Sequence, residues 1–242
     1  DTALVSVMAA NNETGVLQPI AEIAAMCREH GAWFHTDAAQ GFGKIPLDVG
    51  AQNIDLLSIS GHKVYGPKGI GALFVRRRPR IRLEPLFFGG GQERGIRSGT
   101  LPAPLCIGLG AAAAVAAADM ESDGERLAAL RDRFQSRIRA SLPDVQVNGS
   151  MHRRLPHNLN LTFPGVDAQE LLVAVPDLAL STGSACSSAA VEPSYVLAAM
   201  GLSDAEARAT VRIALGRPTS ADDVDRAADR LASAVQGLKK AA

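Results

Sequence analysis

Short apolar runs alternate with polar, glycine-containing stretches along the first part of the chain. Each run has the length of a strand, and a helical spacing of apolar residues separates the first two. Strands that alternate with helices are typical of an α/β layer with a mostly parallel sheet. The four expected strands, of which the first reads as buried, cover residues 3–8, 32–36, 54–59 and 72–75.

The second part of the chain has a different pattern. Two alanine-rich helices are expected at residues 103–119 and 124–140, before short strands near residues 146 and 160. We therefore expect an α/β domain at residues 1–120 and a small α+β domain at residues 121–242. The last helix carries a stripe that is typical of a core-facing helix, formed by Val224, Ala228, Leu231, Val235 and Leu238.

Composition and charge narrow the classes of partner. The 242 residues are 47% hydrophobic and 21% charged, as in globular proteins, and 25 basic residues balance 25 acidic ones. This balance argues against nucleic acid as a partner. No uninterrupted apolar run reaches the roughly 18 residues of a membrane span. Three widely spaced cysteines suit a reducing compartment, so we expect a cytoplasmic protein.

Polar residues follow the expected strands at the carboxyl edge of the sheet, where α/β proteins gather their chemistry. A lysine desolvated at this edge, Lys63, would offer a free amine for Schiff-base formation. Asp37 could hold a pyridine nitrogen protonated, and Ser60 with His62 could bind a phosphate. The alternative is that Lys63 is a surface lysine and Asp37 a helix cap.

Cys186 and Arg212 are further candidates. Cys186 lies among small residues in an expected loop, where a thiol would be accessible to react as a thiolate; an unremarkable thiol is the alternative. Arg212 interrupts an apolar strand and needs an anionic partner, either a structural salt bridge or a substrate carboxylate. The glycines before Lys44 and at residues 89–95 match no nucleotide-binding loop, and no cysteines and histidines have metal-ligand spacing.

Several motifs together resemble the pyridoxal-phosphate-dependent cysteine desulfurases of the NifS/IscS type, within the class V aminotransferase group. Their order and spacing make the match specific, and it runs from the first residues to the last helix. The motifs are NNETG (11–15), HTDAAQ (35–40), SGHKVYGPKG (60–69), residues 89–100, and SAC (184–186) followed by EPSY (192–195). The resemblance implies that the chain begins with the C-terminal part of a large cofactor-binding domain. A small domain that carries the catalytic cysteine loop would follow it.

The resemblance also implies how pyridoxal 5'-phosphate would be bound. Lys63 would carry the cofactor as a Schiff base, and Asp37 would pair with its pyridinium nitrogen. Gln40 would donate a hydrogen bond to its phenolic oxygen, and Asn12 would lie near that oxygen and the substrate carboxylate.

Ser60 and His62 would hold the cofactor's phosphate, according to the same resemblance. Thr100 would reach across a homodimer to the phosphate bound by the neighbouring subunit. Arg212 would bind the substrate carboxylate. Cys186 would take sulfur as a persulfide and could serve as a transient iron–sulfur ligand; no resident metal is expected.

The implied activity is removal of sulfur from L-cysteine, which gives L-alanine and an enzyme-bound persulfide. The persulfide would pass to a sulfur acceptor or an iron–sulfur scaffold protein, for iron–sulfur cluster assembly or other sulfur transfer. The residues around Cys186 look like those of the subgroup that serves such assembly. A selenocysteine lyase-like class V enzyme is an alternative.

By this resemblance the chain lacks the family's N-terminal third. A strand expected as early as residue 3 agrees with missing upstream sequence. The family's glycine–threonine phosphate loop and its ring-stacking histidine have no counterpart here. A second hypothesis is therefore a truncated, non-catalytic remnant that acts only in dimerisation or partner binding.

Overall fold

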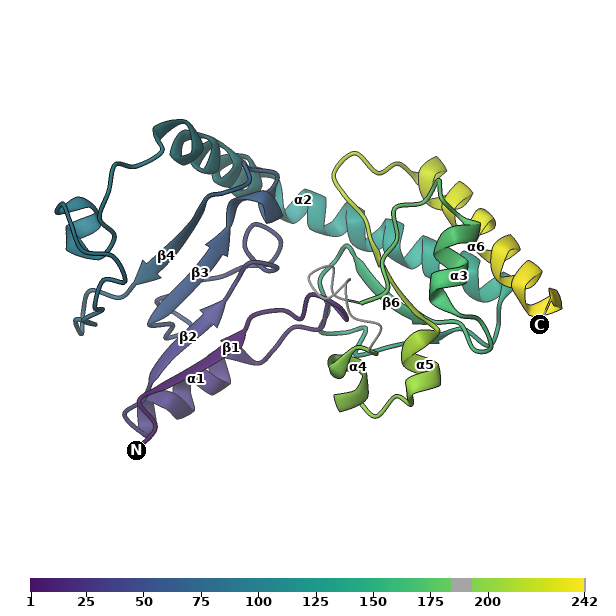
Figure 1. Ribbon diagram of the computed structural model, residues 1–242, viewed down its shortest axis with the longest axis horizontal. Coiled ribbons are helices and arrows are strands. Elements are labelled where there is room, and N and C mark those ends of the chain that lie inside the picture. Colours follow the sequence, from purple (N-terminus) through teal and green to yellow (C-terminus); the bar gives the residue numbers. More distant parts are fainter. Residues whose placement is uncertain (184–192, 242) are drawn as a thin grey trace. The chain divides into compact units, whose positions relative to one another are not determined.

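The computed structural model describes residues 1–183 and 193–241 (Figure 1). Residues that pack together fall into two units. Unit 1 contains Asp1–Ala9 and Gln18–Met120, and unit 2 contains Ala10–Leu17 and Glu121–Ala242. The early segment Ala10–Leu17 thus belongs with unit 2, although most of unit 1 follows it in the chain.

Unit 1 is built on a four-stranded sheet in the order β1-β2-β3-β4. The strands β1, β2 and β3 are parallel, and β4 runs antiparallel to β3. The expectation of a mostly parallel α/β sheet is confirmed. The strand bounds are Leu4–Met8 for β1, Trp33–Asp37 for β2, Leu56–Ser60 for β3 and Gly71–Val75 for β4.

The first strand differs from its expectation as a buried strand. Leu4 and Met8 are 50% and 38% exposed, because β1 lies at the edge of the described sheet. An apolar run therefore does not by itself predict burial on both faces of a strand. The core of unit 1 forms where the helix α1 (Ile20–Glu29) packs against Phe34 and Ile54.

The two helices expected at residues 103–119 and 124–140 are a single helix, α2 (Ala103–Ser141). Residues 120–123, which separate the two expected helices, continue the helix, because Met120 and Glu121 are good helix formers and Ser122 and Asp123 each cost less than about 1 kcal/mol. By length and composition alone, α2 could cross a membrane. One such helix is weak evidence, because core helices meet the same criterion, so the absence of a membrane partner stays a prediction.

Unit 2 contains a three-stranded antiparallel sheet in the order β5-β6-β7. The central strand β6 (Asn158–Thr162) is buried at every position, and β5 (Gln146–Val147) and β7 (Thr210–Ala214) flank it. Asn160 of β6 is paired inside the core, since Nδ2 of Asn148 donates to its Oδ1 at 2.7 Å. Buried amides of this kind are costly unless they are paired.

In the part of unit 2 that the structure describes, four helices follow α2. The last of them, α6 (Ala221–Ala241), buries Val224, Ala228, Leu231 and Val235 in the core, which confirms the expected apolar stripe. Ser203 and Glu206 form the capping box of α5 (Asp204–Arg208). The other two helices are α3 (Ala168–Ala174) and α4 (Tyr195–Ala199).

Candidate active site

The parallel strands of unit 1 end at one edge of the sheet, which is where α/β proteins bind ligands. The register pairs Met8 with Asp37 and Asp37 with Ser58. Asp37 and Ser60 therefore stand at neighbouring strand ends. Asp37 is exposed, and its Oδ1 accepts a hydrogen bond from the Ala39 amide at 2.8 Å, so the carboxylate also stabilises a turn.

The chain turns sharply where β3 ends. Residues Gly61–Val64 form the 3-10 helix η1, and the Ser60 hydroxyl lies 2.9 Å from Nδ1 of His62. Gly61 is needed, because a Cβ there would lie 2.9 Å from Cγ2 of Ile70. This turn leaves the side chain of Lys63 exposed at the sheet edge.

Lys44 is a candidate that the sequence reasoning missed. Burial, and then the positive charge of Lys63, lower the pKa of Lys44 to about 8. The positive charge of Lys63 therefore disfavours the charged form of Lys44. Gln40, which is half-buried, lies between Asp37 and Lys44 in the chain. No spacing rule could reveal Lys44, because only the fold brings it near Lys63.

Asn12 and Arg212 lie in contact in unit 2, although two hundred residues separate them in the chain. Nη1 of Arg212 donates to the backbone oxygen of Asn12 at 3.1 Å. Arg212 is half-buried in the middle of β7, opposite Asn160 of β6. The two residues expected to bind a substrate carboxylate are thus placed together.

The loop that carries Asn12 is itself held by buried hydrogen bonds. Oδ1 of Asn11 accepts from the backbone amides of Glu13 and Thr14, both at 2.9 Å. Gly15 has a φ of 75°, and a Cβ there would collide with the side chain of Asn158. The NNETG motif is therefore a tight turn fixed against β6.

The two remaining expected site residues are Thr100 and Cys186. Thr100 is exposed, and its backbone oxygen accepts a hydrogen bond from Nη1 of Arg97 at 3.3 Å. Its contact with the phosphate of a second subunit stays a prediction. Cys186 falls in residues 184–192, outside the described residues, whose nearest described neighbours are Gly183 and Pro193.

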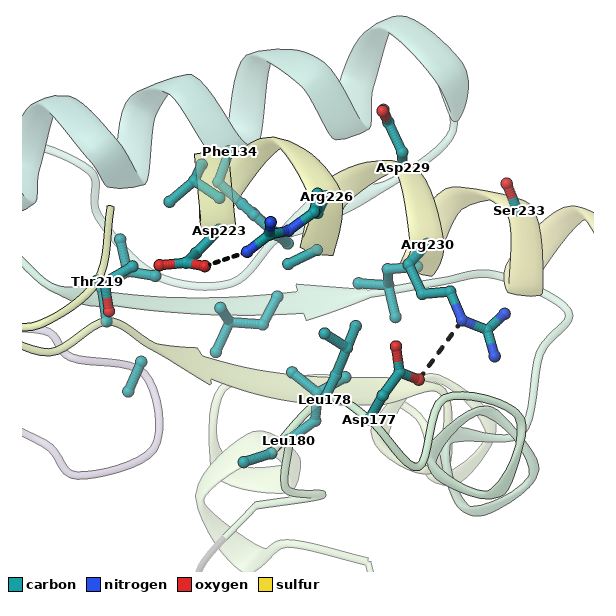
Figure 2. Close-up of a pocket in the computed structure, with 17 residues that line it drawn as sticks. Phe134, Asp177, Leu178, Leu180, Thr219, Asp223, Arg226, Asp229, Arg230 and Ser233 are labelled. Carbon is teal, nitrogen blue, oxygen red and sulfur yellow. Dashed lines mark hydrogen bonds and ion pairs between the residues drawn. The ribbon is translucent and has the colours of Figure 1, made fainter. Parts of the chain in front are cut away.

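A cavity of about 770 Å³ opens in unit 2 beside α6 (Figure 2). Leu178 and Leu180 line it, and ion pairs join Arg226 to Asp223 and Arg230 to Asp177. It includes none of the residues expected to bind cofactor or substrate, so it is not the candidate active site. Among residues 1–183 and 193–241, no three histidine, cysteine, aspartate or glutamate side chains gather as metal ligands.

The donor set at the edge of unit 1 fits pyridoxal phosphate. The primary amine of Lys63 can hold an aldehyde, and the carboxylate of Asp37 can face a protonated ring nitrogen. The Ser60 hydroxyl and the His62 imidazole are suitable donors to a phosphate, and Lys44 adds positive charge nearby.

Comparison with known proteins identifies the family of the chain. The family described as Aminotransferase class-V matches residues 1–227. The chain is 54% identical over 239 residues to a cysteine desulfurase IscS of Rickettsia africae, and this covers 99% of the chain and 58% of the relative. The chain thus spans 58% of the length of this curated relative.

Solved structures of other proteins resemble the fold of this chain over most of its length. A NifS-like protein from Rickettsia africae has a TM-score of 0.85 at 32% identity, which covers 99% of this chain and 62% of that one. DndA from Streptomyces lividans has a TM-score of 0.74 at 43% identity, which covers 88% of this chain and 61% of that one.

Proposed function

Because the chain belongs to the class-V aminotransferase family, we propose that it forms the catalytic part of a pyridoxal-phosphate-dependent cysteine desulfurase. One observation carries the proposal: Asp37, Ser60, His62 and Lys63 stand together at the carboxyl edge of a mostly parallel sheet. The similarity to relatives named cysteine desulfurase supports this choice within the family.

Residues of unit 1 would hold the cofactor. Lys63 would bind it through its amine, Asp37 would keep the ring nitrogen protonated, and Gln40 would donate to the phenolic oxygen. Ser60 and His62 would hold the phosphate. When bound, pyridoxal phosphate supplies an electron sink for charge that develops on the substrate.

Three of the expected residues would act on L-cysteine. Arg212 would pair with the substrate carboxylate, and Asn12 would hold it in orientation, because the two already share a 3.1 Å contact. The amine of Lys63, once displaced by the amine of the substrate, would take the proton from the substrate's Cα. This assignment gives Lys63 two tasks, as a cofactor anchor and as a general base.

Cys186 would accept the sulfur. Its thiolate would attack the sulfur of the substrate, so that an S–S bond forms while the Cβ–S bond breaks and Cβ keeps the electron pair. Protonation of that carbon, together with return of the proton from the amine of Lys63 to Cα, would complete L-alanine and leave a persulfide on Cys186. No external oxidant or reductant is needed, because the substrate carbon is reduced as sulfur is transferred to the thiol.

The remaining expectations belong to the same proposal. The persulfide would pass to a sulfur acceptor or an iron–sulfur scaffold protein in the cytoplasm. The enzyme would be a homodimer in which Thr100 approaches the phosphate of the neighbouring subunit. Exposed Leu86, Phe87 and Phe88 support an interface near this segment, because large apolar side chains in contact with water favour association.

The test is covalent loading of the full-length protein with pyridoxal phosphate. After reduction with borohydride, the pyridoxyl group should be found by mass spectrometry on the peptide that contains Lys63. Lys63→Ala should abolish this labelling, whereas Lys68→Ala, a change of an exposed lysine in the same motif, should not. Labelling that persists in Lys63→Ala would contradict the proposal.

A further inference from the structure

Glu13 is a buried carboxylate that the proposed chemistry does not use. It is 2% exposed and lies in the segment Ala10–Leu17 of unit 2. Its Oε2 accepts a 2.6 Å hydrogen bond from Oγ of Ser194. Burial of a carboxylate is costly unless its oxygens are hydrogen-bonded, so this contact is a specific feature of the fold.

Ser194 and Gly183 stand close to the two ends of residues 184–192, which include Cys186. A Cβ built on Gly183 would lie 3.2 Å from Oε2 of Glu13 and 3.7 Å from Cβ of Ser194. Gly183 and Ser194 are therefore neighbours, and one carboxylate oxygen of Glu13 lies against both. Gly183 also has a φ of +92°, which a side chain would strain.

Ser194 connects Glu13 to the helix α4. While its hydroxyl donates to Glu13, the same oxygen accepts from the amides of Val196 at 3.2 Å and Leu197 at 3.4 Å. Ser194 is thus the N-cap of α4, and its own orientation is set by Glu13.

The loop of Glu13 is also tied to the expected substrate site. The backbone oxygen of Asn12 accepts from Arg212 at 3.1 Å, and that of Glu13 accepts from Nδ2 of Asn160 at 3.3 Å. Asn12 therefore contacts Arg212, which is expected to bind the substrate carboxylate. The next residue of the same loop, Glu13, contacts Ser194, which flanks residues 184–192.

We propose that Glu13 is a positioning residue for sulfur transfer to Cys186. Through Ser194 and Gly183 it fixes the flanks of residues 184–192 relative to Asn12 and Arg212. This inference rests on the proposed function, because it concerns the step in which Cys186 takes the sulfur. A displacement of about 1 Å can slow a reaction about a hundredfold, so loss of the anchor slows sulfur transfer more than substrate binding.

The first test compares Ser194→Ala with Ser203→Ala in the full-length holoenzyme. Ser203 is a matched control, because it also caps a short helix and donates to a glutamate, Oε2 of Glu206, at 2.7 Å. Both variants should lose similar thermal stability. Only Ser194→Ala should slow persulfide formation on Cys186, by about tenfold or more, with the absorbance change on binding L-cysteine retained.

The second test changes Glu13 itself. Glu13→Ala should slow persulfide formation as Ser194→Ala does, and Glu13→Gln should recover most of the rate, because the amide oxygen still accepts from Ser194. In cofactor-free protein, Glu13→Ala should also speed hydrogen exchange at the amides of Val196 and Leu197, although their acceptor Ser194 is unchanged.

The outcomes separate this inference from the proposed function. Equal slowing by Ser194→Ala and Ser203→Ala, or persulfide formation at the wild-type rate in Glu13→Ala, would overturn the positioning role. Cys186→Ala tests the function: if it still forms alanine at the wild-type rate, the proposed function fails. If Cys186→Ala is inactive and Glu13→Ala is as fast as wild type, only the positioning role fails.

Discussion

The sheets of the two units differ in how completely they are covered. Every residue of β6 in unit 2 is buried, whereas four of the five residues of β4 in unit 1 are exposed. Unit 2 also pairs the buried amides of Asn148 and Asn160, while Asp37, His62 and Lys63 of unit 1 stand exposed. The difference agrees with a division of roles in which unit 2 would supply a stable frame and unit 1 would supply most of the proposed cofactor-binding residues.

The largest effect is expected from Asp37→Asn. Loss of the charge opposite the cofactor's ring nitrogen should lower alanine production about 10²- to 10⁴-fold, with the melting temperature unchanged. Asp48→Asn is the matched control, because Asp48 also accepts backbone hydrogen bonds in an exposed turn, from Gly50 at 2.8 Å. A melting temperature that falls with the activity in Asp37→Asn would contradict the division of roles between the units.

A pair of leucine truncations compares the cores directly. Leu161→Ala in β6, where the side chain is 0% exposed, should cost about 3 kcal/mol of unfolding free energy through lost contacts and a residual cavity. Leu73→Ala in β4, where the side chain is 48% exposed, should cost less than about 1 kcal/mol. Urea unfolding measures both, and equal losses would show that the sheets are equally well packed.

The titration of Lys44 should make the free energy of unfolding depend on pH. Its pKa in the folded chain is about 8, below the ordinary lysine value, so the unfolded chain binds more protons between these two values. Stability should therefore rise by about 2 kcal/mol as pH increases from about 8 to about 10.5. Lys44→Met should abolish this part of the rise in urea unfolding, and an identical pH profile in the variant would refute the assignment.

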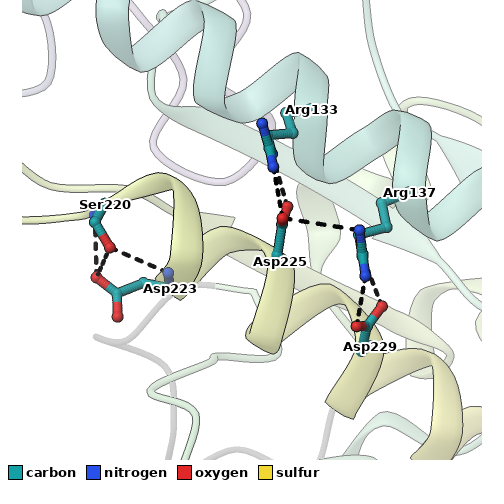
Figure 3. A network of polar contacts seen from close by, with 6 residues as sticks. All are labelled: Arg133, Arg137, Ser220, Asp223, Asp225 and Asp229. Atoms are coloured by element: carbon teal, nitrogen blue, oxygen red, sulfur yellow. Dashed lines mark hydrogen bonds and ion pairs between the residues drawn. The ribbon is translucent and has the colours of Figure 1, made fainter.

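The smallest effect is expected at the ion pairs between α2 and α6 in unit 2 (Figure 3). The hydrogen bond from Arg137 holds the pKa of the Asp229 carboxyl below its usual value. A lowered carboxyl pKa stabilises the fold above the unfolded-state pKa, and this contribution is lost as pH falls through the folded-state pKa. Asp229→Asn should lower the melting temperature slightly at neutral pH, and the difference should vanish at low pH and in molar salt.

Much of the fold follows from local patterns in the sequence. The four strands of unit 1 and the buried stripe of α6 were both expected from the spacing of apolar residues. Local patterns were wrong at two places: residues 120–123 do not interrupt α2, and β1 lies at an edge of the described sheet. The exposure of β1 depends on which strands pair with it, and residues close in sequence do not determine that.

For the candidate site, the sequence predicted the positions of some residues better than their roles. Asp37 and Lys63 stand out by position at strand ends, but their roles came from the family resemblance. Lys44 and Glu13 were missed, because their significance lies in contacts with Lys63 and Ser194 that only the folded chain creates. The spacing of residues in the sequence predicts which edge of the sheet holds the candidate site. Tertiary contacts identify the further residues that affect the charge or the position of the groups in that site.

The most direct test of the central claim is a single turnover of the full-length holoenzyme with L-cysteine. The account predicts that one sulfur atom per active site appears on the peptide of Cys186, together with an equal amount of alanine. Cys106→Ser should preserve both products, and Cys186→Ala should lose both. Alanine released without sulfur on Cys186, or unchanged turnover in Cys186→Ala, would contradict the account.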